Sequence, residues 1–241
     1  MLSLKDTAAC LGMTGTISVL DDFYGFIDPT LPPDPTGATV SVSLLRELNL
    51  LQGEYFHVNI IRVGSDQFTS SELDEVDYSV YRIRNIYATR GIGVGRVEHY
   101  VITTAEANGL DSPTKKSQLR KLTNEWTVPN NGIDFFLVHN MNIPSGPGIL
   151  LGYSNVNGPC GDKSPGILQL SGSTGGLWGS EQTSRTAAHE LGHYMSLRHK
   201  NKVPTNLMCQ SGNASSIRNS VNLTSDQEDD VRDHCFVTDW C

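Results

Sequence analysis

Residues that could perform chemistry are concentrated between positions 189 and 199, where His189, Glu190, His193 and His199 lie close together. On a helix, His189 and His193 are four residues apart, so both imidazoles project from one face and can bind one metal ion. His199 follows six residues after His193, so it can reach that ion only if the helix ends and the chain bends back. Three neutral imidazoles with one open position are the ligand set of a catalytic zinc ion. The spacing therefore predicts a zinc hydrolase with Glu190 as the group that takes a proton from a bound water.

Composition and charge restrict the class of protein. The 241 residues carry a formal net charge of −8, which argues against nucleic acid as a partner because phosphate binding needs clustered Lys and Arg. A hydrophobic content of 38% with 23 Gly and 11 Pro is typical of a globular, loop-rich chain. No apolar run approaches the roughly 20 residues that a membrane span needs. We therefore expect a monomer with one large domain and no membrane span.

Strand patterns begin near residue 55 and must position the histidine segment. Apolar runs predict strands at residues 56–63, 94–103, 133–138 and 166–170. A short apolar stretch at 149–153, held between loops rich in Gly, Pro, Asn and Ser, predicts an edge strand. A Gly- and Ser-rich loop then leads into the helix that carries His189.

Helix patterns lie between and after these strands. One apolar stripe, preceded by a capping pattern at Ser71 and Asp74 and followed by Gly91, consists of Leu73, Val76, Val80, Ile83 and Tyr87. A second helix opens at residues 112–113 and presents Leu119, Leu122 and Trp126. A capping pattern at residues 223–227 predicts a C-terminal helix. Residues 1–54 are irregular and are expected to form a prosegment, a small extension or a β-flap, whereas 55–241 form the catalytic domain.

The segment His189-Glu190-x-x-His193-x-x-Ser196-x-x-His199, followed by Met208, resembles the metzincin zinc metalloendopeptidases. Among these it is most similar to a bacterial-type variant of the matrixin- and reprolysin-like group. The resemblance implies an α+β fold in which a mixed, mostly parallel twisted sheet with an antiparallel edge strand is backed by two long helices. It also implies a zinc cleft between an upper and a smaller lower subdomain, with Met208 in a turn beneath the ion.

The same resemblance implies how a substrate binds and is cleaved. Zinc supplies an activated water, Glu190 acts as general base on it and then passes the proton to the leaving amine. An extended protein or peptide substrate would pair antiparallel with the edge strand near Gly148, Ile149, Leu150, Leu151 and Gly152. Gln210 and Ser211, just after the methionine turn, are candidates for the primed-side pocket.

One residue departs from the metzincin pattern. The family usually has glycine at the position of Ser196, where the backbone turns sharply at the helix end, often with positive φ. Serine adopts that conformation only at a cost of order 1 kcal/mol. Either the turn follows another backbone route, or His199 binds less well. We expect His199 to bind and look for a bent helix end at Ser196.

Five cysteines leave several pairings open. Two disulfides among Cys160, Cys209, Cys235 and Cys241 would suit a secreted enzyme, although Met1–Asp6 lacks the apolar core of a signal peptide. The competing interpretation is that all five cysteines are reduced and buried. We favour a disulfide for Cys160 with Cys209 as its partner, and an inert thiol over a latency switch for Cys10. Calcium in the loops between 154 and 166 is possible in principle, but no ligand spacing there supports it.

Two other functions stay open at this point. The chain could be a zinc-fold binding module with little or no activity, to which Ser196 points, or a narrow-specificity toxin or effector protease. The acidic cluster Asp226, Glu228, Asp229 and Asp230 could supply a glutamate-type third ligand in principle. His199 makes that unnecessary, and the cluster is more simply a solvated helix start.

Overall fold

The computed structural model describes residues 53–145, 148–161, 167–170, 179–210 and 220–239. Its centre is a sheet in the order β2-β1-β3-β7-β6. The strands are β1 (Glu54–Val63), β2 (Gly93–Ile102), β3 (Gly132–Val138), β6 (Gly152–Tyr153) and β7 (Ile167–Leu170). The first four in the order run parallel to their neighbours, and β6 pairs antiparallel with β7 at the edge. The predicted N-terminal segment, residues 1–54, lies outside the described residues except for its last two.

Three further short strands lie among the described residues. β8 (Thr238–Asp239) pairs antiparallel with the start of β1, and β4 (Pro144–Ser145) pairs with β5 (Gly148–Ile149) in a separate two-stranded ladder. The single edge strand expected over 149–153 is therefore divided, and this prediction was wrong in extent. Leu150 and Leu151 lie between β5 and β6 and pack against the apolar cluster under α6, and the Leu150 N–H still donates to the Ile143 carbonyl over 2.9 Å.

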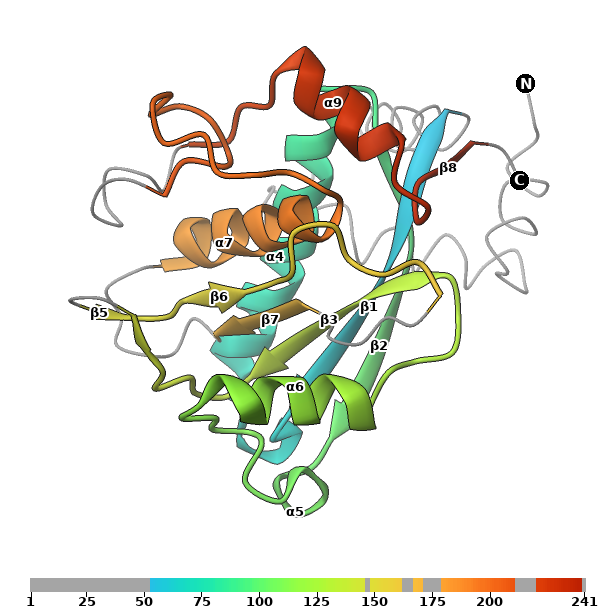
Figure 1. The fold of residues 1–241 in the computed structure, drawn as a ribbon. Coiled ribbons are helices and arrows are strands. Elements are labelled where there is room, and N and C mark those ends of the chain that lie inside the picture. The colour runs from blue at the N-terminus through green and yellow to red at the C-terminus, as the bar shows by residue number, and fades with distance from the viewer. Residues whose placement is uncertain (1–52, 146–147, 162–166, 171–178, 211–219, 240–241) are drawn as a thin grey trace, which may run out of the picture.

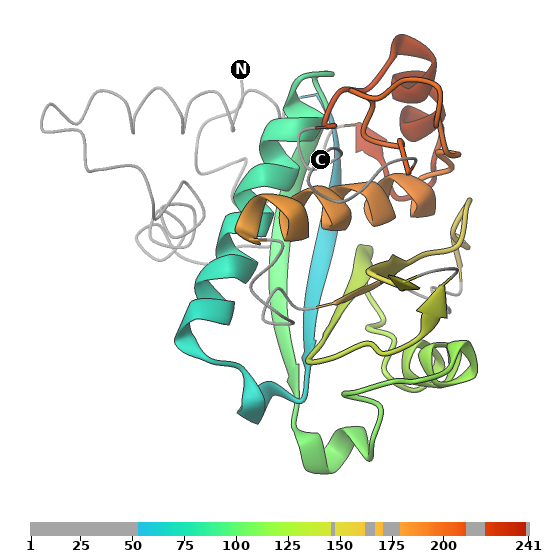
Figure 2. The same cartoon turned by 90° about the vertical axis from the view of Figure 1, so that its left-hand side faces the viewer.

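Helices cover both faces of the sheet. The helices are η1 (Ser65–Gln67), α4 (Ser70–Ala88), α5 (Thr104–Ala107), α6 (Lys116–Glu125), α7 (Gly179–Tyr194) and α9 (Ser225–Arg232). The two long helices α4 and α7 pack on one face and α6 on the other, as Figures 1 and 2 show. None of the described helices is long and apolar enough to cross a membrane.

Alternation along the central strands explains why both faces are covered. In β3, Phe135 and Leu137 belong to the cluster shared with α4 and α7, whereas Phe136 and Val138 belong to the cluster shared with α6. Successive side chains of a strand point to opposite faces, so a strand that is apolar throughout must be buried on both. This confirms the α+β class and the mixed, mostly parallel sheet with an antiparallel edge strand backed by two long helices.

Helix boundaries follow local capping. α4 begins two residues earlier than the pattern at Ser71 and Asp74 suggested, because Thr69 and Glu72 form the capping box instead. The predicted stripe is confirmed from the second turn onward, since Val76, Val80, Ile83 and Tyr87 are all buried. Likewise α6 starts at Lys116 rather than at 112–113, and the pattern at 223–227 does open α9 through a capping box of Thr224 and Gln227.

Candidate metal centre and active site

The three histidines come together at the C-terminal end of α7. One ligating atom from each of His189, His193 and His199 lies within 4.8 Å of the others, and the Nε2 atoms of His193 and His199 are 2.9 Å apart. Zinc with four tetrahedral bonds of ~2.0 Å holds its nitrogens about 3.3 Å apart, so the three atoms are within reach of one such ion. His189 and His193 are 5% and 6% exposed, whereas His199 is exposed.

Backbone carbonyls determine which nitrogen of the two buried rings carries the proton. His189 Nδ1 lies 2.8 Å from the carbonyl oxygen of Leu207, and His193 Nδ1 lies 2.7 Å from that of Leu197. A carbonyl oxygen only accepts, so each Nδ1 donates and each Nε2 keeps its lone pair. Burial also lowers the pKa of all three imidazoles, that of His193 to about 4. Neutral imidazoles whose Nε2 lone pairs are available for coordination, as in His189 and His193, are suited to bind a zinc ion.

The chain reversal that brings in His199 begins at Ser196. Ser196 has φ 76°, its N–H donates to the carbonyl of His193 over 3.1 Å, and Leu197 N–H donates to that of Gly192 over 2.8 Å. These two bonds around a left-handed residue define a Schellman motif, which usually has glycine at this position. The expected bent helix end at Ser196 is confirmed, and the backbone takes the route that glycine favours.

The loop after β6 supports the same helix end. Asn157 and Gly158 donate their N–H groups to the carbonyls of His193 and Tyr194 over 3.0 and 2.7 Å. The Ser196 hydroxyl donates to Asn157 Oδ1 over 3.2 Å, and Asn157 itself has φ 64°. Carbonyls in the last turn of a helix have no partner within the helix, so this loop supplies a donor to the Tyr194 carbonyl and a second donor to the His193 carbonyl, which also accepts from Ser196.

Glu190 is buried on the same helix, against the edge strand β6. Burial raises the pKa of its carboxyl group to about 8, and the nearby guanidinium of Arg185 acts in the opposite direction. The carboxylate lies directly against Gly152 of β6, where an added Cβ would stand 2.6 Å from Glu190 Oε1. Gly152, one of the residues expected to bind substrate, therefore lies in contact with Glu190.

The remaining predicted substrate residues are more dispersed. Gly148 and Ile149 pair with β4, whereas Leu150 and Leu151 are partly buried on the α6 side. Gln210 is exposed, and its N–H donates to Asn201 Oδ1 over 2.8 Å. Ser211 lies outside the described residues.

Met208 and the turn that contains it pack against α7. Met208 is fully buried, and a Cβ on Gly192 would stand 2.9 Å from its sulfur atom. Gly192 lies between the two helical histidines, so the lack of a side chain there lets the methionine approach the helix closely. The methionine turn expected from the sequence therefore lies directly against the histidine helix.

Arg185 is a buried residue of this region that sequence reasoning missed. It lies one helical turn before His189 and donates from Nη2 to the carbonyls of Leu207, over 2.6 Å, and Cys209. Its Nε donates to the carbonyl of Ser220 over 3.4 Å. The Leu207 carbonyl thus accepts from both Arg185 and His189. A lone arginine four residues before the first histidine, among small residues, was the available signal.

A disulfide joins Cys160 to Cys235, not to Cys209, which corrects the predicted pairing. The loop of Cys160 meets the end of α9 rather than the methionine turn, and His234 Nε2 donates to the Gly158 carbonyl over 3.1 Å. Cys209 keeps a fully buried thiol. Cys10 and Cys241 lie outside the described residues.

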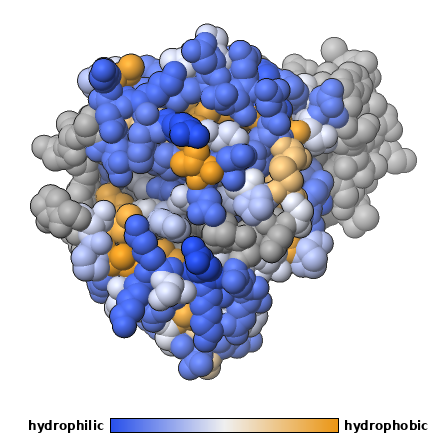
Figure 3. Space-filling view, viewed as in Figure 1, coloured by the Kyte–Doolittle hydropathy of each residue, from blue (hydrophilic) through white to orange (hydrophobic). Residues whose placement is uncertain are grey.

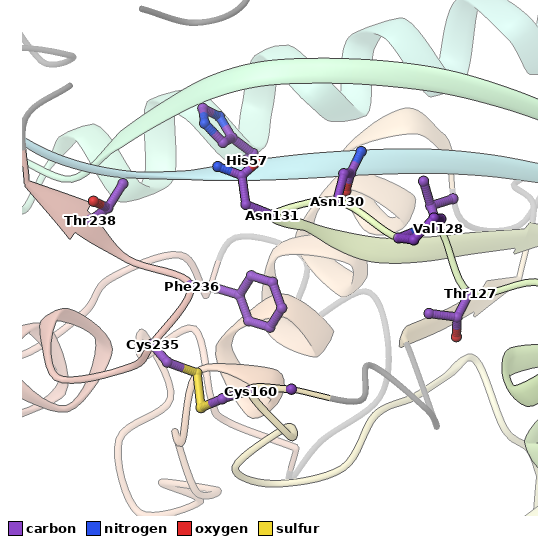
Figure 4. Close-up of a pocket in the computed structure, with 11 residues that line it drawn as sticks. His57, Thr127, Val128, Asn130, Asn131, Cys160, Cys235, Phe236 and Thr238 are labelled. Carbon is purple, nitrogen blue, oxygen red and sulfur yellow. A yellow bond between two sulfur atoms is a disulfide. The ribbon is translucent and has the colours of Figure 1, made fainter.

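A separate cavity of about 710 Å³ lies beside this disulfide. Figure 4 shows the Phe236 ring projecting between the disulfide and the loop that precedes β3. Polar residues on the opposite wall include Asn130, Asn131 and Thr127. None of the three clustered histidines lines it, so this cavity is distinct from the candidate metal centre.

Comparisons with known proteins give a likeness of fold. No family model and no curated protein matches the sequence. Archaemetzincin from Methanopyrus kandleri aligns with 14% identity and a TM-score of 0.48, covering 73% of this chain and 94% of that one. Metalloproteinase-II from Bacteroides fragilis aligns with 12% identity and a TM-score of 0.50, covering 75% of this chain and 53% of that one. The second likeness shows a shared fold.

Proposed function

We propose that this chain is a zinc-dependent endopeptidase that hydrolyses peptide bonds of extended protein substrates. His189, His193 and His199 hold the ion, and Glu190 is the general base. The observation that carries this proposal is the convergence of three imidazoles, two of them with Nδ1 committed to backbone carbonyls, beside a buried carboxylate on the same helix.

The protein's residues act on the substrate and the attacking water in a definite order. When bound, zinc would lower the pKa of a water toward ~7 and polarise the scissile carbonyl. The positive charge of the bound ion would favour the ionised form of Glu190 against the effect of burial. Glu190 then takes a proton from the attacking water and donates it to the leaving amine nitrogen, so that the carboxylate is regenerated when the C–N bond breaks. Leu207 and Leu197 hold the His189 and His193 rings in orientation throughout.

The substrate would lie along the free edge of β6. That strand pairs with β7 on one side, and none of the described strands pairs with its other side. An exposed strand edge presents N–H and C=O groups that an extended peptide can pair with. Figure 3 shows that the described part of this face is mostly hydrophilic with small apolar spots, so backbone pairing is the expected main contact. Gln210 and Ser211 remain candidates for the primed side.

The Cys160–Cys235 disulfide supports an oxidising compartment, and we infer a secreted enzyme. Placement near the matrixin and reprolysin groups rests on the histidine motif and Met208. The inactive-module alternative loses its main support, because Ser196 follows the backbone route that glycine takes in a Schellman motif.

The decisive test compares the parent protein with Glu190→Gln. Glu190→Gln should bind zinc with the parent stoichiometry, measured by metal analysis, and lose at least ~10²-fold in cleavage of a peptide library. Glu181→Gln, on the same helix but paired with Arg82 of α4, is the matched control and should cleave like the parent. Cleavage by the parent should stop on chelation and return with zinc.

Each other result has a distinct meaning. Parent-level cleavage by Glu190→Gln would refute the role of this carboxylate. Zinc binding without cleavage of any library member would favour the binding module. Cleavage confined to one protein target, with casein untouched, would favour the narrow-specificity protease.

A further inference from the structure

Gly152 packs so closely against Glu190 that there is no room for a side chain at position 152. A Cβ at this position would stand 2.6 Å from Oε1, 2.7 Å from Cγ and 2.9 Å from Cδ of Glu190. Ordinary contact begins near 3.4 Å, so the carboxylate would have to move by close to ~1 Å. Gly152 is not among the glycines with positive φ, so the backbone does not require glycine there. What the position requires is the space.

The direction in which β6 presents its two residues explains this contact. Tyr153 points toward α6, where Lys116 Nζ lies 5.3 Å from its ring centre. Because side chains alternate along a strand, the preceding residue faces α7 instead. Gly152 therefore presents bare backbone to the helix surface that carries the general base.

A second glycine repeats the arrangement one helical turn later. A Cβ on Gly158 would stand 2.4 Å from the ring of Tyr194, and Tyr194 follows Glu190 by four residues on the same face of α7. The segment from 152 to 158 thus lies along one face of the active-site helix with two positions that have no side chain. It is held there by the Asn157 and Gly158 hydrogen bonds to the helix end.

We propose that Gly152 is a positioning residue that sets where the Glu190 carboxylate lies. This inference rests on the proposed peptidase function and deepens it. One side of β6 contacts the base, and the free edge of the same two-residue strand is where the substrate would pair. The distance between the scissile bond and the base is then fixed by one direct backbone contact. A side chain at 152 would displace the base without touching the metal ligands.

The kinetic test uses Gly152→Ala with Gly161→Ala as its control. Gly161 lies in the same loop region, and an added Cβ there meets nothing within 4 Å. At parent zinc content, Gly152→Ala should lower kcat by about 100-fold, the order expected for a misplacement of ~1 Å, with a smaller change in KM. Gly161→Ala should match the parent. Unchanged kcat in Gly152→Ala would overturn the inference.

A double-variant cycle separates positioning from general damage. In the Glu190→Ala background the new methyl group meets no Cγ, Cδ or carboxylate, so adding Gly152→Ala should leave the residual kcat of that variant unchanged. Equal losses in both backgrounds would mean that the alanine acts elsewhere, and would sink the proposal.

A stability measurement tests the contact between position 152 and Glu190 without relying on enzymatic activity. Gly152→Ala should lower the Tm of the zinc-free protein that has Glu190, and should leave Tm unchanged when Glu190 is replaced by alanine. The same drop in both backgrounds would overturn the inference. A parent that cleaves no peptide would refute the proposed function alone, and this coupled Tm shift would still decide whether Gly152 positions Glu190.

Discussion

Ser196 offers the sharpest measurement of how this chain holds its third histidine. Its φ of 76° is a conformation that costs a non-glycine residue roughly 1–2 kcal/mol. Its hydroxyl donates to the exposed Asn157 Oδ1 over 3.2 Å, a bond worth about 0.5–1.5 kcal/mol. The side chain thus offsets part of the strain that its own presence creates.

Two substitutions separate these terms. Ser196→Ala keeps the strained backbone and loses the hydrogen bond, so the unfolding free energy should fall by about 1 kcal/mol. Ser196→Gly also loses the bond but removes the strain, while the unfolded chain gains about 0.5–1 kcal/mol of entropy, and the net change should be near zero. Glycine should therefore be about 1 kcal/mol more stable than alanine.

Urea unfolding of the zinc-free protein measures this order, and a thermal scan should separate the two variants by about 2–4 °C. Zinc affinity, measured by competition with a chromophoric chelator, should follow the same order because His199 lies just beyond the turn. Alanine as stable as glycine would refute the reasoning, since it would mean that the left-handed backbone carries no strain here.

Two further predictions concern buried cationic and titratable groups. Arg185→Met removes a hydrogen-bond donor from the Cys209 and Leu207 carbonyls, so the free energy of unfolding should fall by roughly 2–4 kcal/mol and zinc affinity by about 10–100-fold in the chelator competition. The control Arg82→Met, at the α4 surface, should change neither quantity by much. An unaltered zinc affinity in Arg185→Met would disprove the role of Arg185 in supporting the metal site. Burial, with Arg96 adding to it, lowers the pKa of His57 to about 4, below the ordinary ~6.5, so the unfolded state binds more protons between these values. The His57 contribution to stability should then be fully present above pH ~6.5 and be lost as the pH falls toward about 4, by at most ~1.4 kcal/mol per pH unit. Urea unfolding of zinc-free His57→Asn, which keeps an acceptor for the Arg96 N–H, should show a shallower pH dependence than the parent, and parallel curves would contradict the assignment.

Periodicity made the fold and the meeting of the three histidines predictable. Residues four apart share a helix face, so His189 and His193 had to point the same way, and the requirement for a bend before His199 pointed to Ser196, whose φ is 76°. Apolar runs located the central strands to within about two residues, because strands buried on both faces leave little choice of register.

The rest depended on contacts between distant segments. The sequence offers two overlapping capping patterns, Thr69 with Glu72 and Ser71 with Asp74. Only the folded chain shows that Glu72 forms the capping box with Thr69. Four cysteines allow three pairings, so the partner of Cys160 could not be read from spacing. The sequence placed Gly152 in the substrate-binding edge strand, but not against the general base, since that contact is with a glutamate 38 positions later in the chain.

The Cys160–Cys235 bond also determines what a break in the chain would do to this molecule. Glu190, the three histidines and the methionine turn all lie within the 75-residue span that it closes. A single peptide-bond cut anywhere inside that span leaves two pieces that are still covalently joined, so neither can diffuse away with part of the metal site. A peptidase can be cleaved by other copies of itself, and this disulfide keeps the two fragments joined after one internal cut. Reduction of the disulfide followed by the same cut would release the fragments.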